Sequence, residues 1–172
     1  MLVKPKVFGD DRGFFLESFS RRDFESAGIE MEIVQINHSS SVKGVLRGLH
    51  FQYRPFQQAK LVRCIRGEIL DVAVGIRPGS ASFGKHFPVN LSESNRFMLY
   101  VPRGFAHGFV VLSDTAEVEY AVDNVYSPDH EGGIIWNDPD LAIRWPVEKT
   151  ILSEKDRKWP LLRDIRDSLG KR

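Results

Sequence analysis

The feature that most constrains the fold is a series of short apolar runs interrupted by glycine. Side chains over Lys60–Arg66 alternate between apolar and polar, Gly67 and Glu68 break the pattern, and it resumes over Ile69–Ile76. Alternation with a period of two is typical of a β-strand, because successive side chains point to opposite faces. Two such runs joined by so short a break predict a hairpin.

The same pattern recurs further along the chain. Each apolar run is followed by a cluster rich in glycine, proline, serine or aspartate, which are residues that favour turns. Many short strands punctuated in this way predict an all-β, antiparallel sandwich or barrel with short peripheral helices. The expected strands are Phe97–Val101, Phe105–Leu112 and Ala116–Val122, with turns at 77–80, 102–104 and 113–114.

Helix signals are few. The segment Ser20–Gly28 predicts one short helix, with Ser20 as its N-cap, Asp23 in the first turn and Gly28 as its terminator. A second short helix is expected to start at Ser153. Both helices would lie at the periphery of a β structure.

Size and charge restrict the classes of function. With 172 residues the chain fits one domain, which we place at residues 1–172. The net charge of +1 gives no basis for nucleic-acid binding, and no apolar run is long enough to span a membrane. Cys64 is the only cysteine, so no internal disulfide can form. We therefore expect a soluble, cytoplasmic protein with neither nucleic acid nor membrane as a partner.

One polar aromatic residue is predicted to point into the sandwich. Tyr120 shares a strand face with Ala116, Val118 and Val122, and the two glutamates between them share the other face. A half-buried strand turns its charged face to water, so Tyr120 should point inward. An inward tyrosine most simply needs a hydrogen-bond partner for its hydroxyl group.

Two histidines follow glycine-containing runs at the ends of apolar stretches. His107 ends the run PRGFAH at 102–107, which has the P-x-G-x-x-H spacing of the second cupin motif. The first cupin motif normally supplies H-x-H, but His50 has Gly48 and Gln52 at the two positions where a second histidine would stand. A catalytic metal usually needs three protein ligands, so we expect a cupin-like barrel without a metal. Either histidine alone is equally compatible with a structural role.

Three charged residues have more than one interpretation. Lys60 lies on the inward, apolar face of its strand, so it is either functional or extends from the strand end to solvent. Asp71 stands within the apolar run at 69–74 and could pair with Lys60 or with a histidine. Asp156 has the spacing of a capping residue that reaches back to Ser153.

Taken together, a series of runs spread over nearly the whole chain resembles the dTDP-4-dehydrorhamnose 3,5-epimerase family. Any one run would be weak, but the order and spacing of RGLH and GFAHGF are specific. The matching runs are DRGFFLE at 11–17, VQINHS at 34–39, VLRGLHFQ at 45–52, QAKLVR at 58–63, GEILDVAV at 67–74, PRGFAHGF at 102–109, YSP at 126–128, WNDPD at 136–140 and LSEKD at 152–156.

The resemblance implies a jelly-roll fold, a homodimer, and no metal or organic cofactor. It also implies epimerisation at C3 and C5 of dTDP-4-dehydro-6-deoxy-glucose, giving dTDP-4-dehydro-L-rhamnose in dTDP-L-rhamnose biosynthesis. The C4 ketone acidifies the hydrogens at C3 and C5, because loss of either proton gives an enolate. Such an isomerase needs a base on one face of the sugar, an acid on the other, and a cation near the ketone oxygen.

The family's catalytic roles carry over to matching positions. His50 resembles the general base, oriented and made more basic by Asp156, and Tyr120 resembles the acid that reprotonates the opposite face. Lys60 resembles the residue that stabilises the enolate, with His107 nearby. The positions that match substrate contacts are Arg12, Phe15, Glu17, Gln35, Asn37, Arg47, Lys60, His107, Tyr126, Glu131 and Lys155.

The nucleotide is expected to meet aromatic and basic side chains. Phe15 and Tyr126 match aromatic contacts in the family, and Tyr126 would stack on the thymine base. An arginine can donate two parallel hydrogen bonds to pyrophosphate oxygens, which suits Arg12 or Arg47.

The chain departs from the family at two positions and needs an irregular strand at another. Gly75 and Ile36 stand where the family usually has aspartate, so we expect two charges near the barrel to be missing. Strict alternation puts Arg47 and His50 on opposite strand faces. Both can reach the site only if the strand bulges, and Gly48 is the natural place for a bulge.

Three alternatives to the double epimerase stay open. A single-centre epimerase, acting at C3 or C5 only in another deoxysugar pathway, would share the catalytic residues. A metal-dependent cupin belongs to a different enzyme class and is disfavoured by the missing H-x-H. A non-catalytic sugar-nucleotide binding module is disfavoured because His50, Lys60, Tyr120 and Asp156 are all present.

Overall fold

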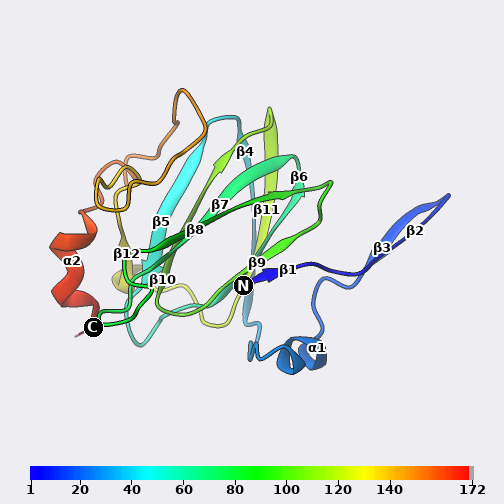
Figure 1. The fold of residues 1–172 in the computed structure, drawn as a ribbon, viewed down its shortest axis with the longest axis horizontal. Helices are drawn as coiled ribbons and strands as arrows, with labels where there is room; N and C mark the ends of the chain where they lie inside the picture. Colours follow the sequence, from blue (N-terminus) through cyan, green and yellow to red (C-terminus); the bar gives the residue numbers. More distant parts are fainter. Residues whose placement is uncertain (171–172) are drawn as a thin grey trace.

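Two antiparallel five-stranded sheets pack against each other as a sandwich (Figure 1), which confirms the predicted all-β jelly-roll fold. The computed structural model describes residues 1–170, so positions 171 and 172 of the predicted domain 1–172 lie outside the described range. We name each sheet after one of its strands. The β11 sheet has the order β1 (Leu2–Val3), β9 (Met98–Val101), β6 (Lys60–Arg66), β11 (Thr115–Val122) and β4 (Gln35–Val42). The β5 sheet has the order β12 (Glu131–Gly133), β5 (Leu46–Gln52), β10 (Phe105–Val111), β7 (Glu68–Gly75) and β8 (His86–Ser92).

The predicted hairpin over residues 60–76 is wrong, although both of its strands exist. β6 pairs with β9 and β11, whereas β7 pairs with β10 and β8, so the two strands lie in different sheets. The chain passes between the sheets at Gly67, where φ is +75° and an added Cβ would lie 2.2 Å from the Thr115 carbonyl oxygen. Residues 69–75 of β7 are all buried, because the β5 sheet is covered on both faces.

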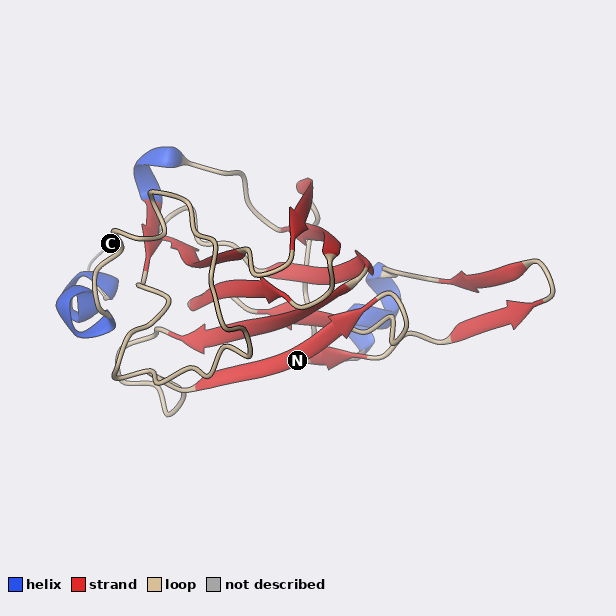
Figure 2. Cartoon of the chain, turned by 90° about the horizontal axis from the view of Figure 1, so that it is seen from above, coloured by secondary structure: helices blue, strands red, loops and turns tan. Residues whose placement is uncertain are grey.

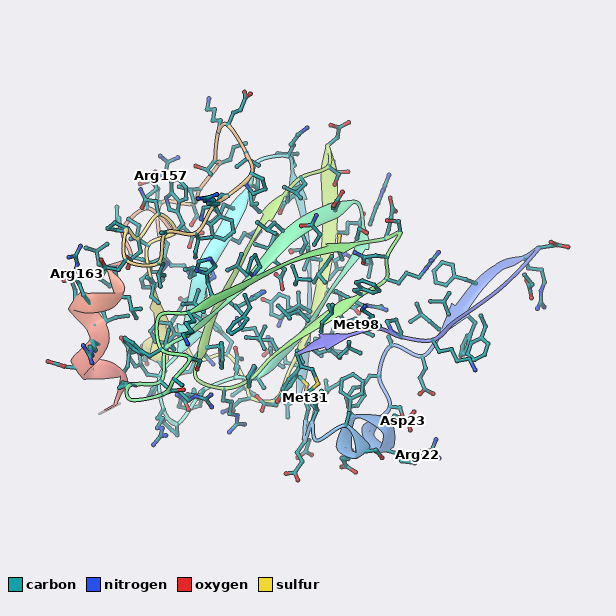
Figure 3. The ribbon with its side chains drawn as sticks, in the orientation of Figure 1. Arg22, Asp23, Met31, Met98, Arg157 and Arg163 are labelled. Carbon is teal, nitrogen blue, oxygen red and sulfur yellow. The ribbon has the colours of Figure 1, made fainter. Side chains whose placement is uncertain are left out.

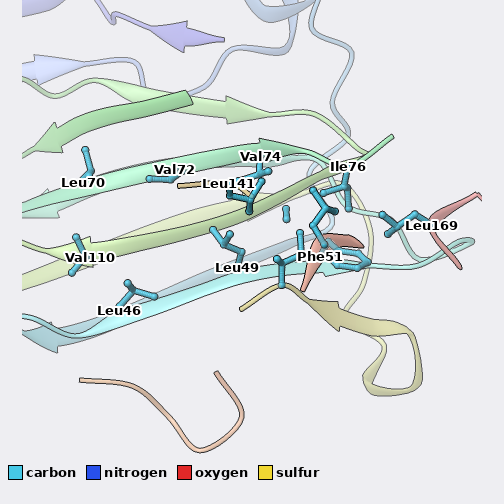
Figure 4. Close-up of a cluster of buried hydrophobic side chains, with 13 residues drawn as sticks. Leu46, Leu49, Phe51, Leu70, Val72, Val74, Ile76, Val110, Leu141 and Leu169 are labelled. Atoms are coloured by element: carbon cyan, nitrogen blue, oxygen red, sulfur yellow. The ribbon is translucent and has the colours of Figure 1, made fainter. Parts of the chain in front are cut away.

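Two apolar layers enclose the β5 sheet. One fills the space between the sheets, where side chains such as Val62 of the β11 sheet meet Ile69 of the β5 sheet. The other covers the outer face, where Leu46 and Leu49 belong to the same cluster as buried residues of α2 (Leu162–Leu169) (Figure 4). Burial of one such side chain typically contributes about 1.5–3 kcal/mol. The β5 sheet is therefore a firmly packed support for the residues it carries.

The helix predicted at 20–28 is confirmed as α1 (Arg21–Ser26). Its N-cap is Ser20, whose Oγ accepts a hydrogen bond of 3.4 Å from the Asp23 backbone N–H. The buried face of α1 belongs to an apolar cluster that includes Met31 and Met98. Figure 3 shows these two methionines near α1, at the edge of the sandwich.

The helix predicted to start at Ser153 is wrong. Residues 154–157 form turns in which the Asp156 N–H donates to Ser153 Oγ at 3.1 Å, and α2 begins only at Leu162. Pro160 disfavours helical backbone at Trp159, so the turns cannot continue as a helix. None of the helices within residues 1–170 combines the length and the apolar character that crossing a bilayer requires.

A separate two-stranded sheet, whose strands the sequence patterns did not predict, projects from the sandwich. β2 (Val7–Asp10) pairs with β3 (Gly13–Leu16) and with no other strand within residues 1–170. Figure 2 shows this hairpin extending to one side, away from both five-stranded sheets. The hairpin carries two of the predicted substrate contacts, Arg12 in its turn and Phe15 in β3.

Candidate active site

A cavity of about 380 Å³ lies between the two sheets. Most of the predicted site residues line it, although they come from strands and loops far apart in the sequence. The β11 sheet contributes Gln35, Asn37, Lys60 and Tyr120, the β5 sheet contributes Arg47, His50, His107 and Glu131, and loops contribute Tyr126 and Lys155.

Arg47 and His50 both face this cavity because β5 contains a β-bulge. Their partners on β10 are separated by one residue, whereas Arg47 and His50 are separated by two. Gly48 has a φ of +146°, and an added Cβ would lie 2.6 Å from the Cα of Gly108. The bulge predicted at Gly48 is therefore confirmed, and only glycine allows the two strands to approach so closely there.

His50 is held by Asp156, a residue 106 positions away in the sequence. The distance from His50 Nε2 to Asp156 Oδ1 is 2.5 Å, and Trp159 Nε1 donates to the same oxygen at 3.2 Å. Burial alone would raise the pKa of Asp156, but the hydrogen bonds from His50, Ser153 and Trp159 and the charge of His50 outweigh burial and lower it. The predicted capping role is wrong, because the Asp156 carboxylate binds His50 while Ser153 Oγ accepts the Asp156 N–H.

His107 is held by Asp71 in the same way but at greater depth. The distance from His107 Nε2 to Asp71 Oδ1 is 2.7 Å, and the two side chains are 7% and 0% exposed. Asp71 lies on β7 and His107 on the adjacent β10, so two paired strands fix both partners. Of the two pairings left open for Asp71, the structure shows the one with a histidine.

Lys60 lines the cavity, so its functional interpretation is favoured over extension to solvent. Its Nζ lies 5.7 Å from the centroid of the Tyr120 ring. Burial lowers the pKa of Lys60 to about 8, and the negative charges of Asp71 and Glu131 limit this fall. The ammonium group is therefore mostly protonated at neutral pH and places a positive charge in the cavity.

Tyr120 points into the cavity from β11, as strand parity predicted. On the opposite face of β11, Glu119 pairs with Arg63 of β6 at 2.9 Å. Burial is the main cause that raises the pKa of Tyr120, with a lowering effect from Arg47, so the phenol stays protonated at neutral pH. Because His50 belongs to the β5 sheet, the imidazole and the phenol stand on opposite walls of the cavity.

The remaining lining residues form a polar network around Glu131. This carboxylate accepts hydrogen bonds from Lys155 Nζ at 2.7 Å and from the Tyr126 hydroxyl at 2.9 Å. Burial would raise the pKa of Glu131, but these two partners lower it. Gln35 donates to Asn37 Oδ1 at 2.7 Å and accepts the Tyr126 backbone N–H at 3.4 Å. The Tyr126 ring, with 49% of the residue exposed, remains available to a ligand.

Three predicted substrate contacts do not line this cavity. Arg12 lies at the turn of the β2–β3 hairpin, where it pairs with Asp10 at 2.5 Å and is 89% exposed. Phe15 and Glu17 line a different, largely apolar cavity beside the N-terminus and α1. Within a single chain, the hairpin residues and the cavity residues therefore do not form one site.

The two departures from the family pattern have little effect on the cavity. Ile36 is 60% exposed and stands between two inward-facing residues of β4, so it points away from the cavity. The charge that the family usually carries at this position would therefore lie on the outer face of the β11 sheet, away from the cavity. At Gly75, an added Cβ would lie 2.2 Å from the Ser82 carbonyl oxygen, so the backbone leaves no room for any side chain.

Gln52 supports the site although sequence reasoning did not identify it. Its Nε2 donates to the carbonyl oxygens of Phe56 at 2.6 Å and Val125 at 3.0 Å, and its Oε1 accepts the Ser127 N–H at 2.7 Å. These bonds fix the loop that carries Tyr126. The available signal was an amide two residues after the bulged segment, on the inward face of β5. Trp159, which supports Asp156, gave no comparable signal in the sequence.

Comparison with known proteins connects this geometry to one family. Residues 1–164 match the dTDP-4-dehydrorhamnose 3,5-epimerase family. The chain belongs to this family. A dTDP-4-dehydrorhamnose 3,5-epimerase of Shigella flexneri is 56% identical to this epimerase over 157 residues, which are 91% of this chain and 87% of the relative.

Solved structures of similar proteins share the fold of the epimerase. The dTDP-6-deoxy-D-glucose-3,5-epimerase of Legionella pneumophila, in complex with dTDP-4-keto-L-rhamnose, matches with a TM-score of 0.95 and 47% identity over 98% of this chain and 90% of that chain. A 3'-monoepimerase of Streptomyces bikiniensis, in complex with dTDP-quinovose, matches with a TM-score of 0.91 and 33% identity over 97% of this chain and 85% of that chain.

These matches confirm the predicted enzyme class. The epimerase is an isomerase that acts as a sugar-nucleotide 3,5-epimerase in dTDP-L-rhamnose biosynthesis. Within residues 1–170, no group of three or more histidine, cysteine, aspartate or glutamate side chains is arranged to hold a metal ion.

Proposed function

We propose that the epimerase inverts C3 and C5 of dTDP-4-dehydro-6-deoxy-glucose with His50 as the base and Tyr120 as the acid. The observation that carries this proposal is that the two side chains face one cavity from opposite sheets. Epimerisation removes a proton from one face of a carbon and delivers another to the opposite face. Two groups on opposite walls can do this without turning the substrate over.

The contacts of His50 assign its proton-accepting atom. With its proton on Nε2, His50 donates a hydrogen bond to Asp156 Oδ1. Its Nδ1 has no hydrogen-bond partner within residues 1–170. The lone pair of Nδ1 is therefore free to take a proton from C3 or C5. The adjacent carboxylate also balances the charge of the imidazolium that forms, as in other histidine–aspartate pairs.

Lys60 makes removal of the proton easier. When the C–H bond breaks, its electron pair forms a C=C bond to C4, and the C4=O pair moves onto the oxygen. The positive charge of Lys60 stabilises this enolate, and one such contact is commonly worth about 3–4 kcal/mol. As the enolate collapses, Tyr120 gives its proton to the carbon, and His50 and Tyr120 then recover their original states through solvent.

The nucleotide would occupy the polar end of the lining. We expect the exposed Tyr126 ring to stack on thymine, and Arg47, which hydrogen-bonds Ser41 at 3.0 and 3.1 Å, to reach the pyrophosphate. Glu131 and Lys155 hold the loops around this end together through their 2.7 Å bridge. Gln35 and Asn37 complete the proposed contacts from β4.

Hydrogen exchange in deuterated water tests the reaction directly. Incubation of the epimerase with the 4-keto-6-deoxyglucose nucleotide should place deuterium at both C3 and C5. Deuterium at only one carbon would instead support the single-centre alternative, an activity for which the S. bikiniensis relative is named. In His50→Ala, we expect no exchange at either carbon while dTDP binding persists. Undiminished exchange in that variant would exclude His50 as the base.

We also propose that the epimerase is a homodimer in which the β2–β3 hairpin of one chain completes the site of the other. A two-stranded hairpin is only marginally stable alone, and this one exposes more than half of Phe8, Phe14 and Phe15. The exposed rings suit an interface. Arg12 and Phe15, which the family resemblance places on the substrate, would then reach a cavity that they cannot reach in their own chain.

Mixing two inactive variants tests this arrangement. One variant carries Arg12→Ala and Phe15→Ala in the hairpin, and the other carries His50→Asn in the cavity. In a mixed dimer, one site receives an intact hairpin and an intact cavity, so co-expression should restore about a quarter of the wild-type activity. A monomer in light scattering, or no recovery despite formation of mixed dimers, would contradict the proposal.

We further propose that the chain acts as one domain over residues 1–172, in the cytoplasm and without a metal. Cys64 is buried and free of any disulfide, which suits a reducing compartment. Cell fractionation tests the compartment. Metal analysis of the active protein, together with activity after chelation, tests the absence of a metal. Stoichiometric metal with loss of activity on chelation would refute it.

A further inference from the structure

Asp71 is a buried acid for which the proposed reaction has no direct use. Its side chain is 0% exposed, and it stands on the face of β7 that contributes Ile69 and Ala73 to the apolar layer between the sheets. Its Oδ1 meets His107, but its Oδ2 is buried without a hydrogen-bond partner within residues 1–170. Leaving a carboxylate oxygen unpaired in such surroundings destabilises the folded protein. A structural need alone would be met at lower cost by an apolar side chain.

His107 presents one ring nitrogen to each side. Nε2 is occupied by Asp71, while Nδ1 has no hydrogen-bond partner within the described chain and the ring lines the substrate cavity. An ionised Asp71 can only accept a hydrogen bond, so it requires a proton on Nε2. Asp71 thus determines that Nδ1 is the nitrogen that faces the substrate. No other group within residues 1–170 hydrogen-bonds this Nδ1.

We propose that Asp71 is a positioning residue of the epimerase, which fixes the His107 ring and its Nε2 proton so that the lone pair of His107 Nδ1 accepts a hydrogen bond from a hydroxyl group of the substrate. This inference rests on the proposed reaction. Because His107 and His50 stand directly opposite each other on β10 and β5, a fixed His107 also bounds the space in which the sugar can lie.

The test uses the full-length protein with ¹⁵N-labelled histidine, and the His107 signals are assigned by their loss in His107→Gln. In the wild type, neutral His107 should carry its proton on Nε2. In Asp71→Asn, which keeps the size of the side chain, an amide group can donate to Nε2 or accept from it, so the Nε2–H signature should weaken or be lost. We expect kcat to fall about 10- to 100-fold with little change in KM, since one preorganised contact is misplaced.

Two comparisons separate positioning from loss of structure. Cys64→Ala alters a 3% exposed residue of the same apolar layer and should leave both the His107 signals and kcat unchanged. The double variant Asp71→Asn/His107→Gln should be no less active than His107→Gln alone, because Asp71 acts through His107. A neutral wild-type His107 protonated on Nδ1, or fully additive losses in the double variant, would overturn the proposal. The NMR result does not depend on the substrate, so it can fail independently of the proposed reaction.

Discussion

Two histidine–aspartate pairs face the same cavity, yet the protein holds them in different ways. His50 and Asp156 are 2.5 Å apart with side chains 27% and 5% exposed, whereas His107 and Asp71 are 2.7 Å apart with side chains 7% and 0% exposed. The two histidines are direct neighbours on paired strands. Their acids differ in origin, since Asp156 comes from a loop near the C-terminus and Asp71 from a strand inside the β5 sheet.

The difference matches two chemical tasks. A base must return its proton to solvent after each turnover, so partial exposure of His50 is useful. A group that only presents a fixed hydrogen-bonding atom gains from complete burial, because neighbouring strands hold it and water does not compete. The supporting bonds differ as well, since Asp156 accepts a second hydrogen bond from Trp159, whereas Oδ2 of Asp71 has no hydrogen-bond partner within residues 1–170.

Replacing each histidine separately should give the largest difference between the base and the positioned hydrogen-bonding group. We expect His50→Asn to lower kcat about 10⁴-fold, the upper range for loss of a general base, and to stop exchange at both C3 and C5. His107→Asn should lower kcat only about 10²-fold and leave exchange detectable at both carbons. Both variants should bind dTDP as the wild type does by calorimetry. Equal losses in the two variants would remove the distinction between the pairs.

The next largest effect should come from the acid on the loop. Asp156→Asn can donate to His50 Nε2, which favours a proton on Nδ1 and blocks the base, so we expect kcat to fall about 10³-fold. Glu154→Gln is the matched control, because Glu154 lies in the same loop, is 82% exposed, and should leave kcat unchanged. Steady-state kinetics compare the kcat of the two variants, and circular dichroism checks that both are folded. A small loss in Asp156→Asn would mean that Asp156 does not orient the base.

Local patterns in the sequence predicted the parts of this comparison that depend on one strand. Parity placed Tyr120 inward, and the mismatch between Arg47 and His50 located the bulge at Gly48. Pairings over long sequence distances were not available, so the partner of Asp71 stayed open. For the same reason the sequence pattern predicts a hairpin of β6 and β7 that the structure does not contain, since alternation within a strand does not say which sheet it joins. Arg12 was named as a substrate contact only through the family resemblance, and no local pattern in the sequence showed that it would lie on a hairpin away from the cavity.

The pH dependence of kcat tests the positive charge of Lys60, which lines the same cavity as both histidines. Lys60 is protonated below its pKa of about 8 and loses its charge above it, so kcat should fall as the pH rises through about 8. Lys60→Arg keeps the positive charge and should move this fall to higher pH, although its different shape lowers the maximum rate. Lys60→Met should lower kcat about 10²-fold at pH 7 and remove the alkaline fall. A pH profile in Lys60→Arg identical to that of the wild type would assign the fall to another group.

The smallest effect should come from the second donor to Asp156. Trp159→Phe removes the 3.2 Å hydrogen bond to Oδ1 while keeping a ring over Gly133, where an added Cβ would lie 2.4 Å from the indole. Loss of one such bond is typically worth about 0.5–1.5 kcal/mol, so kcat should fall about 2- to 12-fold with KM unchanged. Trp145→Phe is the matched control, since it loses a 2.9 Å hydrogen bond to the Trp136 carbonyl, which involves neither His50 nor Asp156, and should affect thermal stability but not kcat. If both variants lose kcat equally, the effect is one of general stability, and Asp156 does not need Trp159 to orient His50.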